Sequence, residues 1–234
     1  MPLSLPQLTL ALFDDAQVDL EDFVPGQNQL VVDAVARWSA GDGPWFLMLW
    51  GRSGTGKSHL IEAAVRATGR DSGRAMYIPL THVLESGPSI LDDLESIDYL
   101  AIDDMHIAAG DAGWERALFN LFNRTQDARG RLLVSSANGP SGFRFELPDL
   151  RSRLNSGLLY QLVELGDAEK QLVLQKRAAS RGLSMPDTVA SYLIRRLRRN
   201  MHELNTIFDA IDAASLSAGR ELTIPFVRDV LGLD

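Results

Sequence analysis

The segment Gly51-Arg52-Ser53-Gly54-Thr55-Gly56-Lys57-Ser58 constrains the fold more than any other part of this chain. It lies between an apolar run, 46–50, and a helical pattern that starts at His59, and it fits G-x-x-x-x-G-K-[ST] at every fixed position. Its glycines let successive backbone N–H groups point at phosphate oxygens, and the following helix adds the positive end of its dipole. The segment therefore predicts a P-loop that binds a purine nucleoside diphosphate or triphosphate.

A P-loop places a lysine between the β- and γ-phosphates and a hydroxyl on Mg²⁺. Lys57 and Ser58 occupy these two positions. The residues of this segment that we expect to contact the nucleotide are Gly51, Ser53, Gly54, Thr55, Gly56, Lys57, Ser58 and His59. The expected cofactors are ADP or ATP, with Mg²⁺. A chance glycine-rich turn is the alternative, and the flanking strand and helix patterns argue against it.

A pair of acids, Asp103 and Asp104, follows the apolar run 99–102. This pattern is typical of a central parallel strand whose carboxyl end reaches the crevice where ligands bind. We expect Asp103 to join Ser58 in holding the Mg²⁺ shell, and Asp104 to polarise the attacking water. Two acids in a surface turn are the alternative, which the P-loop upstream disfavours.

The apolar segments and helical patterns predict an α/β fold. We expect a doubly wound core of five parallel strands, at 46–50, 75–80, 99–104, 131–136 and 158–163. Helical patterns occur before the first strand at 30–38, between later strands at 90–94 and 114–128, and after the last strand at 167–181, 187–198, 200–217 and from 224 onward. The expected divisions are an N-terminal segment 1–15, a nucleotide-binding core 16–165 and a small C-terminal helical lid 166–234.

Composition narrows the classes of partner. The formal net charge of −8 disfavours strong sequence-independent binding to nucleic acid, because that binding depends on Lys and Arg displacing counterions. The basic run Arg195 to Arg199 indicates a solvated helix face, with a phosphate contact as the alternative. The chain has no cysteine and no apolar run of about 18 residues, so we expect a cytoplasmic protein without membrane contact.

The order of these motifs resembles that of the DnaA-related AAA+ ATPases. The shared features are His59 after the P-loop serine, the Asp103-Asp104 pair, the block 149–154 and the closing segment 222–227. The resemblance covers nearly the whole chain and implies an AAA+ P-loop core with a helical lid. It also implies that Val24 and Pro25 contact adenine.

Two positions depart from the family pattern at the nucleotide. Ala137 stands where the family has an acid at sensor 1, although Ser136 and Asn138 beside it are polar. His202 stands at the sensor 2 arginine, and a histidine is shorter and only partly charged near neutral pH. These departures predict weak hydrolysis by the chain itself. The family's arginine finger aligns with Arg153, for which a solvated helix face is the alternative.

The segment Gln7-Leu8-Thr9-Leu10-Ala11-Leu12 resembles the short glutamine-leucine motif that binds the bacterial sliding clamp. The resemblance implies that the contacts to the clamp come from Gln7, Leu8, Leu10, Leu12 and Phe13. A strand or arm packed on its own domain is the alternative reading.

The resemblance to regulatory members of the family implies a negative regulator of DNA replication initiation. Such a protein acts with the DNA polymerase III β sliding clamp loaded on DNA, and Arg153 enters the nucleotide site of DnaA to stimulate ATP hydrolysis. Its DNA contact is then indirect, through the clamp, and a homodimer stays open. The alternative is a self-contained AAA+ ATPase, such as a helicase loader or a shortened DNA-binding initiator, which the intact P-loop favours and the net charge disfavours.

Overall fold

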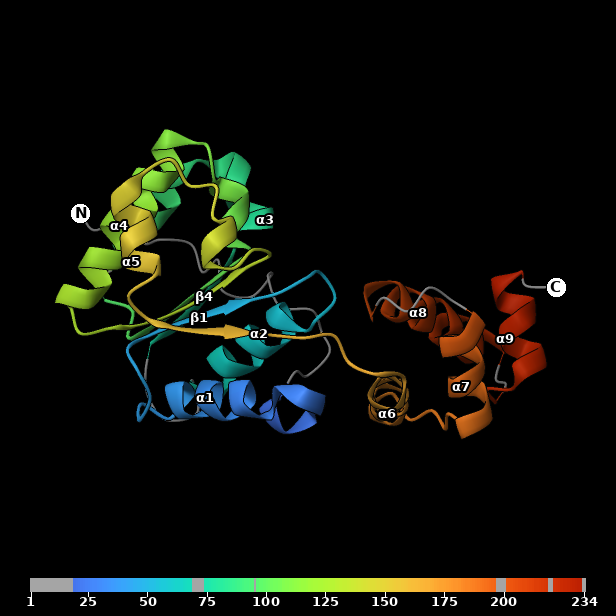
Figure 1. Cartoon of the computed structure of the whole chain (residues 1–234). Coiled ribbons are helices and arrows are strands. Elements are labelled where there is room, and N and C mark those ends of the chain that lie inside the picture. Colours follow the sequence, from blue (N-terminus) through green and yellow to red (C-terminus); the bar gives the residue numbers. More distant parts are fainter. Residues whose placement is uncertain (1–18, 69–73, 95, 197–200, 219–220, 233–234) are drawn as a thin grey trace, which may run out of the picture. The chain divides into compact units, whose positions relative to one another are not determined.

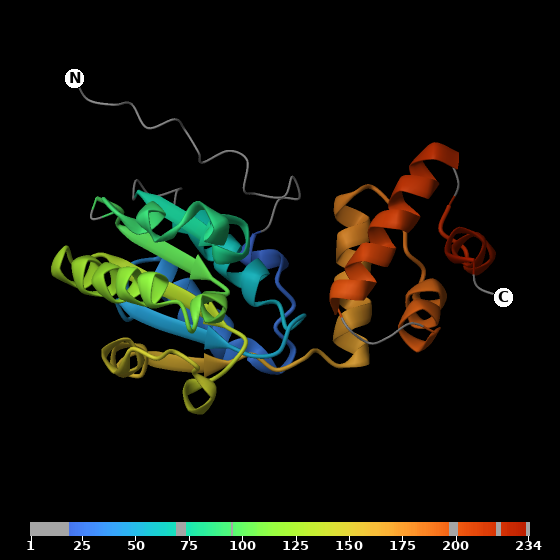
Figure 2. The same ribbon diagram turned by 90° about the horizontal axis from the view of Figure 1, so that it is seen from above.

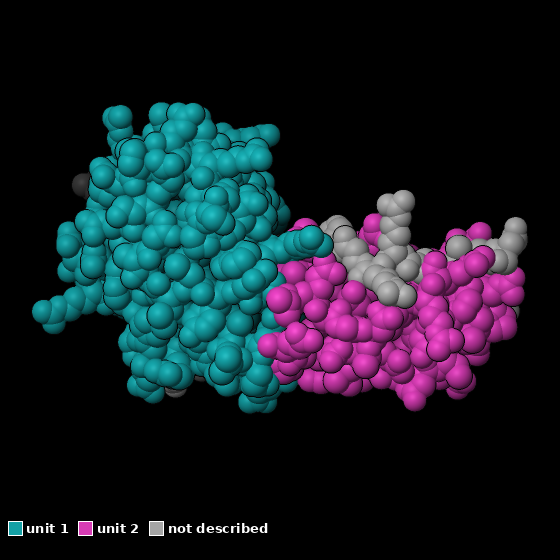
Figure 3. Space-filling model, in the orientation of Figure 1, with its two compact units in different colours: residues 1–21, 28–52, 56–162 teal, residues 22–27, 53–55, 163–234 magenta. Residues whose placement is uncertain are grey.

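The computed structural model describes residues 19–68, 74–94, 96–196, 201–218 and 221–232. By its contacts the chain divides into two units, coloured separately in Figure 3. Unit 1 comprises Met1–Glu21, Asn28–Arg52 and Gly56–Leu162, and unit 2 comprises Asp22–Gln27, Ser53–Thr55 and Val163–Asp234.

Unit 1 contains the predicted parallel sheet of five strands, in the order β2-β3-β4-β1-β5. The strands are β1 Phe46–Trp50, β2 Ala75–Pro79, β3 Tyr99–Asp103, β4 Arg131–Ser136 and β5 Leu158–Gln161. The central strands are continuous apolar runs because helices cover both faces of the sheet. In register, Met48 of β1 lies between Val134 and Leu159. The prediction of five parallel strands is confirmed.

Helices form a layer on each face of this sheet, as Figure 1 shows. One face carries α1 (Gln29–Ser39) and α2 (Lys57–Thr68). The other carries α3 (Leu80–Val83), α4 (Ala112–Asp127) and α5 (Pro148–Leu154). Short 3₁₀ turns connect the elements, at η2 Leu20–Asp22, η3 Gly26–Asn28, η5 Leu84–Ser86, η6 Pro88–Leu91, η7 Met105–Ala108 and η8 Pro140–Gly142.

One predicted helix is wrong. The pattern at 90–94 is not helical, because Pro88–Leu91 forms the 3₁₀ turn η6 with Pro88 in its first turn. Asp92 then adopts an extended conformation and Asp93 has a φ of 59°, in the left-handed region. Two successive non-helical residues end the turn before an α-helix can form.

Unit 2 contains the predicted helices of the lid, which Figure 2 shows from above. They are α6 Asp167–Ser180, α7 Asp187–Arg196, α8 Met201–Ala218 and α9 Ile224–Leu231. Leu174, Leu193, Phe208 and Val227 bring one buried side chain from each helix into a common core. Within the described ranges, none of the helices has the length and apolar character that crossing a bilayer requires.

Candidate functional site

The loop between β1 and α2 has the backbone that its sequence predicts. Gly54 and Gly56 have φ values of 80° and 93°, in the left-handed region that glycine enters without a steric cost. Helix α2 begins at Lys57, directly after the last of these glycines. The N–H of Gly51 donates to the carbonyl of Ser136 at 3.2 Å, so the start of the loop is fixed to the carboxyl end of β4.

Lys57 is only 6% exposed, although it carries an ammonium group. Its Nζ donates to the carbonyl of Gly51 at 2.8 Å and to that of Arg52 at 3.0 Å. Burial lowers the pKa of Lys57, and the negative charges of Asp104 and Asp103 partly oppose this shift. A cation held this way beside the loop is placed to meet the negative charge of a phosphate.

Asp103 ends β3 and is 3% exposed. Its Oδ2 accepts a hydrogen bond from the hydroxyl of Tyr77 at 3.0 Å, and its Oδ1 accepts one from the hydroxyl of Ser135. Burial raises the pKa of Tyr77, and the charge of Asp103 adds to the effect, so the phenol stays a donor. The two neighbouring strands thus fix both oxygens of this carboxylate.

Asp104 has a φ of 54°, a left-handed conformation that is uncommon for a residue with a Cβ. Its N–H donates to the hydroxyl oxygen of Ser135 at 2.8 Å. Burial raises the pKa of its carboxyl, and Asp103 adds to this, whereas His106 and Lys57 oppose it. A carboxylate with a raised pKa is a better acceptor for the proton of a water molecule, as a general base requires.

His106, in η7, connects the acid pair to the end of β4. Its Nδ1 accepts a hydrogen bond from the N–H of Ala137 at 3.2 Å. The same Nδ1 lies 3.8 Å from Oδ1 of Asp104, but an atom that accepts a hydrogen bond carries no proton to share with a carboxylate. We therefore assign the neutral tautomer with its proton on Nε2. Burial lowers the pKa of His106, in agreement with this assignment.

The carboxyl end of β4, next to the predicted sensor 1 position Ala137, carries two buried hydroxyls. Ser135 and Ser136 are both fully buried. The hydroxyl oxygen of Ser136 accepts a hydrogen bond from the N–H of Asn138 at 3.2 Å, so this side chain stabilises the loop after β4. A Cβ at Gly139 would lie 2.9 Å from the ring of Trp50. Because glycine has no Cβ, this loop can approach the end of β1 closely.

Arg153 lies in the last turn of α5 and is exposed. Its guanidinium carbon is 6.0 Å from the ring centre of Phe122, and that ring packs against Phe46, the first residue of β1. The P-loop leaves β1 at the other end, after Trp50. A strand of this length spans about 13 Å. Arg153 therefore lies near the amino end of β1, and the P-loop lies at its carboxyl end.

Of the residues predicted from the sequence, the structure brings together Lys57, Asp103 and Asp104 and leaves Arg153 apart from them. Val24 and Pro25 lie between η2 and η3, and Val24 is 6% exposed. His202 falls in the first turn of α8. The predicted clamp contacts all precede residue 19 and lie outside the described residues.

The donor set fits Mg²⁺ bound together with a nucleotide. Among the described residues, no group of three or more His, Asp or Glu side chains is placed to hold a metal ion on its own. Mg²⁺ is commonly held by one or two protein oxygens, with the rest of its shell from phosphates and water. The Ser58 hydroxyl and the Asp103 carboxylate would supply oxygens of this kind to Mg²⁺ bound with a nucleotide.

Sequence reasoning missed three residues that shape the site: Tyr77, His106 and Ser135. The register of the sheet would have identified Ser135, because Ile102 pairs with Val134 and the next residue of each strand is then adjacent. No sequence signal marks Tyr77 or His106, whose partners are set by the fold.

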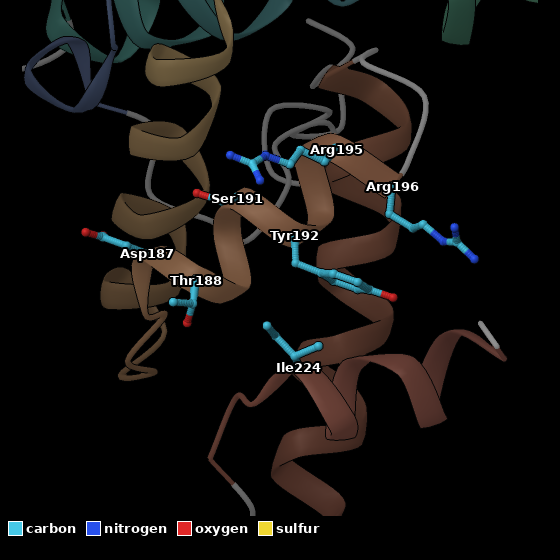
Figure 4. A pocket seen from close by; sticks show the side chains of 7 residues that line it. All are labelled: Asp187, Thr188, Ser191, Tyr192, Arg195, Arg196 and Ile224. Atoms are coloured by element: carbon cyan, nitrogen blue, oxygen red, sulfur yellow. The ribbon is translucent and has the colours of Figure 1, made fainter.

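A second feature is a groove of about 500 Å³ along α7 in the lid, shown in Figure 4. Its lining comes from one helical face together with the start of α9: Asp187, Thr188, Ser191, Tyr192, Arg195, Arg196 and Ile224. The amide of Gln175 donates to Asp187 at 2.6 Å, and the hydroxyl of Ser191 donates to Gln171 at 3.2 Å. These two polar groups thus already join α7 to α6.

Comparisons with known proteins agree with this geometry. A model of the bacterial DnaA ATPase domain matches residues 15–161, and a model of the Hda lid domain matches residues 167–231. An uncharacterized protein of Haemophilus influenzae is 39% identical over 229 residues, which cover 97% of this chain and 99% of that protein.

Solved structures show the same fold. Domain III of DnaA from Thermotoga maritima has a TM-score of 0.79 at 21% identity, covering 92% of this chain and 95% of that one. AMPPCP-bound DnaA from Aquifex aeolicus has a TM-score of 0.70 at 21% identity, covering 88% of this chain and 68% of that one. The predicted AAA+ core and helical lid are confirmed at the level of the fold.

Proposed function

Since this chain belongs to the DnaA-related AAA+ proteins and is Hda-like, we propose that it stimulates ATP hydrolysis by DnaA through Arg153 in trans. Hydrolysis of that ATP prevents re-initiation, so the protein is a negative regulator of DNA replication initiation. The family supports an interaction with DnaA, and the position of Arg153 supports the finger.

The observation that carries the proposal is the separation of Arg153 from the chain's own P-loop. Arg153 is exposed, stands over Phe122 near the amino end of β1, and is at the far edge of the sheet from Lys57. An arginine in this place is available to the nucleotide of a neighbouring protein and not to its own. The planar guanidinium, which stays charged, suits the spread charge of a transferring phosphoryl group.

The chain's own ligand in this proposal is ADP or ATP, which keeps the protein in one conformation. Lys57 and the loop N–H groups bind the phosphates, Val24 and Pro25 contact adenine, and Ser58 and Asp103 hold Mg²⁺. When bound, Mg²⁺ neutralises charge on the phosphate oxygens. Ala137 and His202 replace two polar groups of the family, and the chain therefore hydrolyses its own ATP slowly.

The segment 1–15 is the proposed tether to the β sliding clamp, ahead of a core at 16–165 and a lid at 166–234. Gln7, Leu8, Leu10, Leu12 and Phe13 bind the clamp, and the clamp encloses the DNA on which DnaA is found. This tether raises the effective concentration of Arg153 near DnaA without a direct contact to DNA. Loss of clamp pull-down in Gln7→Ala supports the tether, and unchanged pull-down contradicts it.

The test of the finger is turnover of DnaA-bound ATP in the presence of clamp loaded on DNA. We compare the wild-type protein with Arg153→Ala and with Arg151→Ala, an exposed arginine two positions earlier in the same helix. Arginine fingers contribute about 10³–10⁵ in rate, so Arg153→Ala removes the stimulation while Arg151→Ala retains most of it. Equal stimulation by wild type and Arg153→Ala contradicts the proposal.

A second candidate is a self-contained ATPase that binds DNA directly. The observations that favour it are the complete set Lys57, Asp103 and Asp104, and the two arginines in the α7 groove. This function predicts brisk ATP turnover by the chain alone and salt-dependent binding to DNA that weakens in Arg195→Ala. Slow turnover and no DNA binding without the clamp favour the regulator.

A further inference from the structure

Glu115 is the most deeply buried carboxylate among the described residues, at 1% exposure, and neither of the proposed nucleotide chemistries uses it. Its Oε1 accepts from the N–H of Gly110 at 2.8 Å and from the N–H of Glu146 at 3.0 Å. Its Oε2 accepts from the N–H of Leu147 at 2.6 Å. Within the described part of the chain, Glu115 forms no ion pair with a Lys, Arg or His, so backbone donors alone satisfy this carboxylate.

The three donors come from two segments that are distant in sequence. Gly110 follows η7, the turn that continues from Asp104 on the nucleotide side of the sheet. Glu146 and Leu147 directly precede α5, the helix that carries Arg153. From these contacts we propose that Glu115 is a positioning residue that fixes the start of α5 to the segment after the acid pair and so orients Arg153. The part that concerns Arg153 rests on the proposed function.

The start of α5 has no capping side chain of its own. Its N-cap residue is Leu147, which has no polar side chain, and Pro148 has no N–H. A helix start of this kind leaves backbone N–H groups that need an acceptor from elsewhere. Glu115 accepts from the N–H of the N-cap residue Leu147 and from the N–H of Glu146 before it, and hydrogen bonds to a charged acceptor are stronger than those between neutral groups.

Helix α4 does not need Glu115 for its own start. Asp111 is the N-cap, and its Oδ1 accepts from the N–H groups of Gly113 at 2.8 Å and Trp114 at 3.0 Å. Asp111 thus caps the first turn of α4, while the carboxylate of Glu115 joins the N–H of Gly110, just before that cap, to the N–H groups of Glu146 and Leu147 before α5.

The other end of α5 is also supported by α4. Phe122 lies seven residues, or about two helical turns, after Glu115 on the same buried face, and its ring lies under Arg153 at 6.0 Å. In addition, Leu150 and the last residue of α5, Leu154, are fully buried in the core. Helix α4 thus contacts α5 at both ends. The carboxylate of Glu115 binds the start of α5, and the ring of Phe122 lies under Arg153 in its last turn.

The test uses Glu115→Gln, which keeps the shape of the side chain and replaces one accepting oxygen by an NH₂ donor. Glu146→Gln is the matched control, because it removes an exposed carboxylate next to the same backbone segment. We expect Glu115→Gln to lower the maximal rate of stimulated DnaA ATP hydrolysis by about 10- to 100-fold, as for a misplaced catalytic group. The concentration that gives half-maximal stimulation, and ADP binding by the chain itself, stay within about twofold of wild type.

Hydrogen exchange supplies a readout that does not depend on DnaA. Amides in 146–154 exchange faster in Glu115→Gln than in Glu146→Gln, while amides in the P-loop helix are unchanged. Unchanged exchange in 146–154, or an unchanged maximal rate, overturns the positioning role. A simultaneous loss of ADP binding and of protection throughout unit 1 also overturns it, because the residue would then be needed for folding alone.

Two further measurements separate the possible failures. If wild-type protein does not stimulate DnaA, the proposed function fails, and the exchange of 146–154 still decides whether Glu115 fixes α5. If Glu115→Gln does not fold, Glu115→Asp retains the charge with a shorter reach. A lower maximal rate with intact ADP binding in that variant supports the proposal, and wild-type behaviour overturns it.

Discussion

The imidazole Nδ1 of His106 accepts a hydrogen bond from the backbone N–H of Ala137 at 3.2 Å, joining the turn after β3 to the loop after β4. Ala137 has no side chain that can report on a phosphate, but its backbone is bound to the residue that lies beside Asp104. The contact requires a neutral imidazole, because protonated Nδ1 is a donor. The loop after β4 is therefore sensitive to the protonation of one histidine.

His106→Asn tests this sensitivity through the pH dependence of stability. Burial lowers the pKa of His106 in the folded state, so its protonation opposes folding, and stability is lost as pH falls from the unfolded pKa of about 6.5. The Asn oxygen accepts the same hydrogen bond at every pH. We expect the wild-type melting temperature to fall further than that of His106→Asn between pH 7.5 and 5.5, by about 2–4 °C for one hydrogen bond.

The charged groups that face His106 also shift its pKa, and a second histidine serves as the control. Asp104 and Asp103 raise its pKa and Lys57 lowers it, but burial is the largest effect. His82→Asn, which removes an exposed histidine from α3, is the control variant. Parallel pH profiles for wild type and His106→Asn would show that the imidazole does not control this contact.

Asp104→Asn should stabilise the protein without nucleotide and metal. The pKa of Asp104 is raised, mainly by burial, so the ionised carboxylate destabilises the fold above its folded pKa. This cost disappears below the unfolded pKa of about 3.9. We expect the melting temperature in EDTA to be higher for Asp104→Asn than for wild type at pH 7.5, and the gain to shrink as pH approaches 4.

Asp93→Asn is the matched control for Asp104→Asn. Both aspartates have left-handed backbones, with φ values of 59° and 54°, but Asp93 is exposed. Asn adopts this conformation readily, so any gain from the backbone alone appears in both variants and at every pH. An equal gain in the two variants would mean that burial of the Asp104 charge has no measurable cost.

The sequence predicts the sheet and the P-loop because each depends on local pattern. Buried parallel strands are continuous apolar runs, and the loop glycines stand where the backbone needs a positive φ, as at Gly54 and Gly56. The turn at Pro88–Leu91 could not be predicted in this way, since its apolar residues match a helix until Asp93 reverses the backbone. Partners such as Tyr77 for Asp103, or Glu115 for Leu147, arise only when distant segments meet.

Ser135→Ala should be more destabilising than Tyr77→Phe, although each removes one hydroxyl. Ser135 donates to Asp103 and also accepts from the N–H of Asp104, whereas the hydroxyl of Tyr77 donates to Asp103. Loss of Ser135 leaves a buried acceptor and a backbone donor without their partner, so we expect about 2–3 kcal/mol, against about 1 kcal/mol for Tyr77→Phe. Urea unfolding of both variants without nucleotide measures the difference. Equal losses would show that the bond from the Asp104 N–H contributes little.

Lys57→Met should separate stability from nucleotide binding. Burial lowers the pKa of Lys57 because it removes water from the ammonium, and the bonds to the carbonyls of Gly51 and Arg52 offset that loss. An apolar side chain of similar length removes both effects, so the free energy of unfolding without nucleotide changes by less than about 1 kcal/mol.

A charged hydrogen bond to phosphate contributes about 1.5–3 kcal/mol, so ADP should bind about 10- to 100-fold more weakly. Calorimetric titration with ADP measures this loss, and Arg116→Met, which removes an equal charge from the exposed face of α4, should bind as wild type does. Wild-type affinity in Lys57→Met would mean that the ammonium stays on the loop carbonyls when the nucleotide is bound.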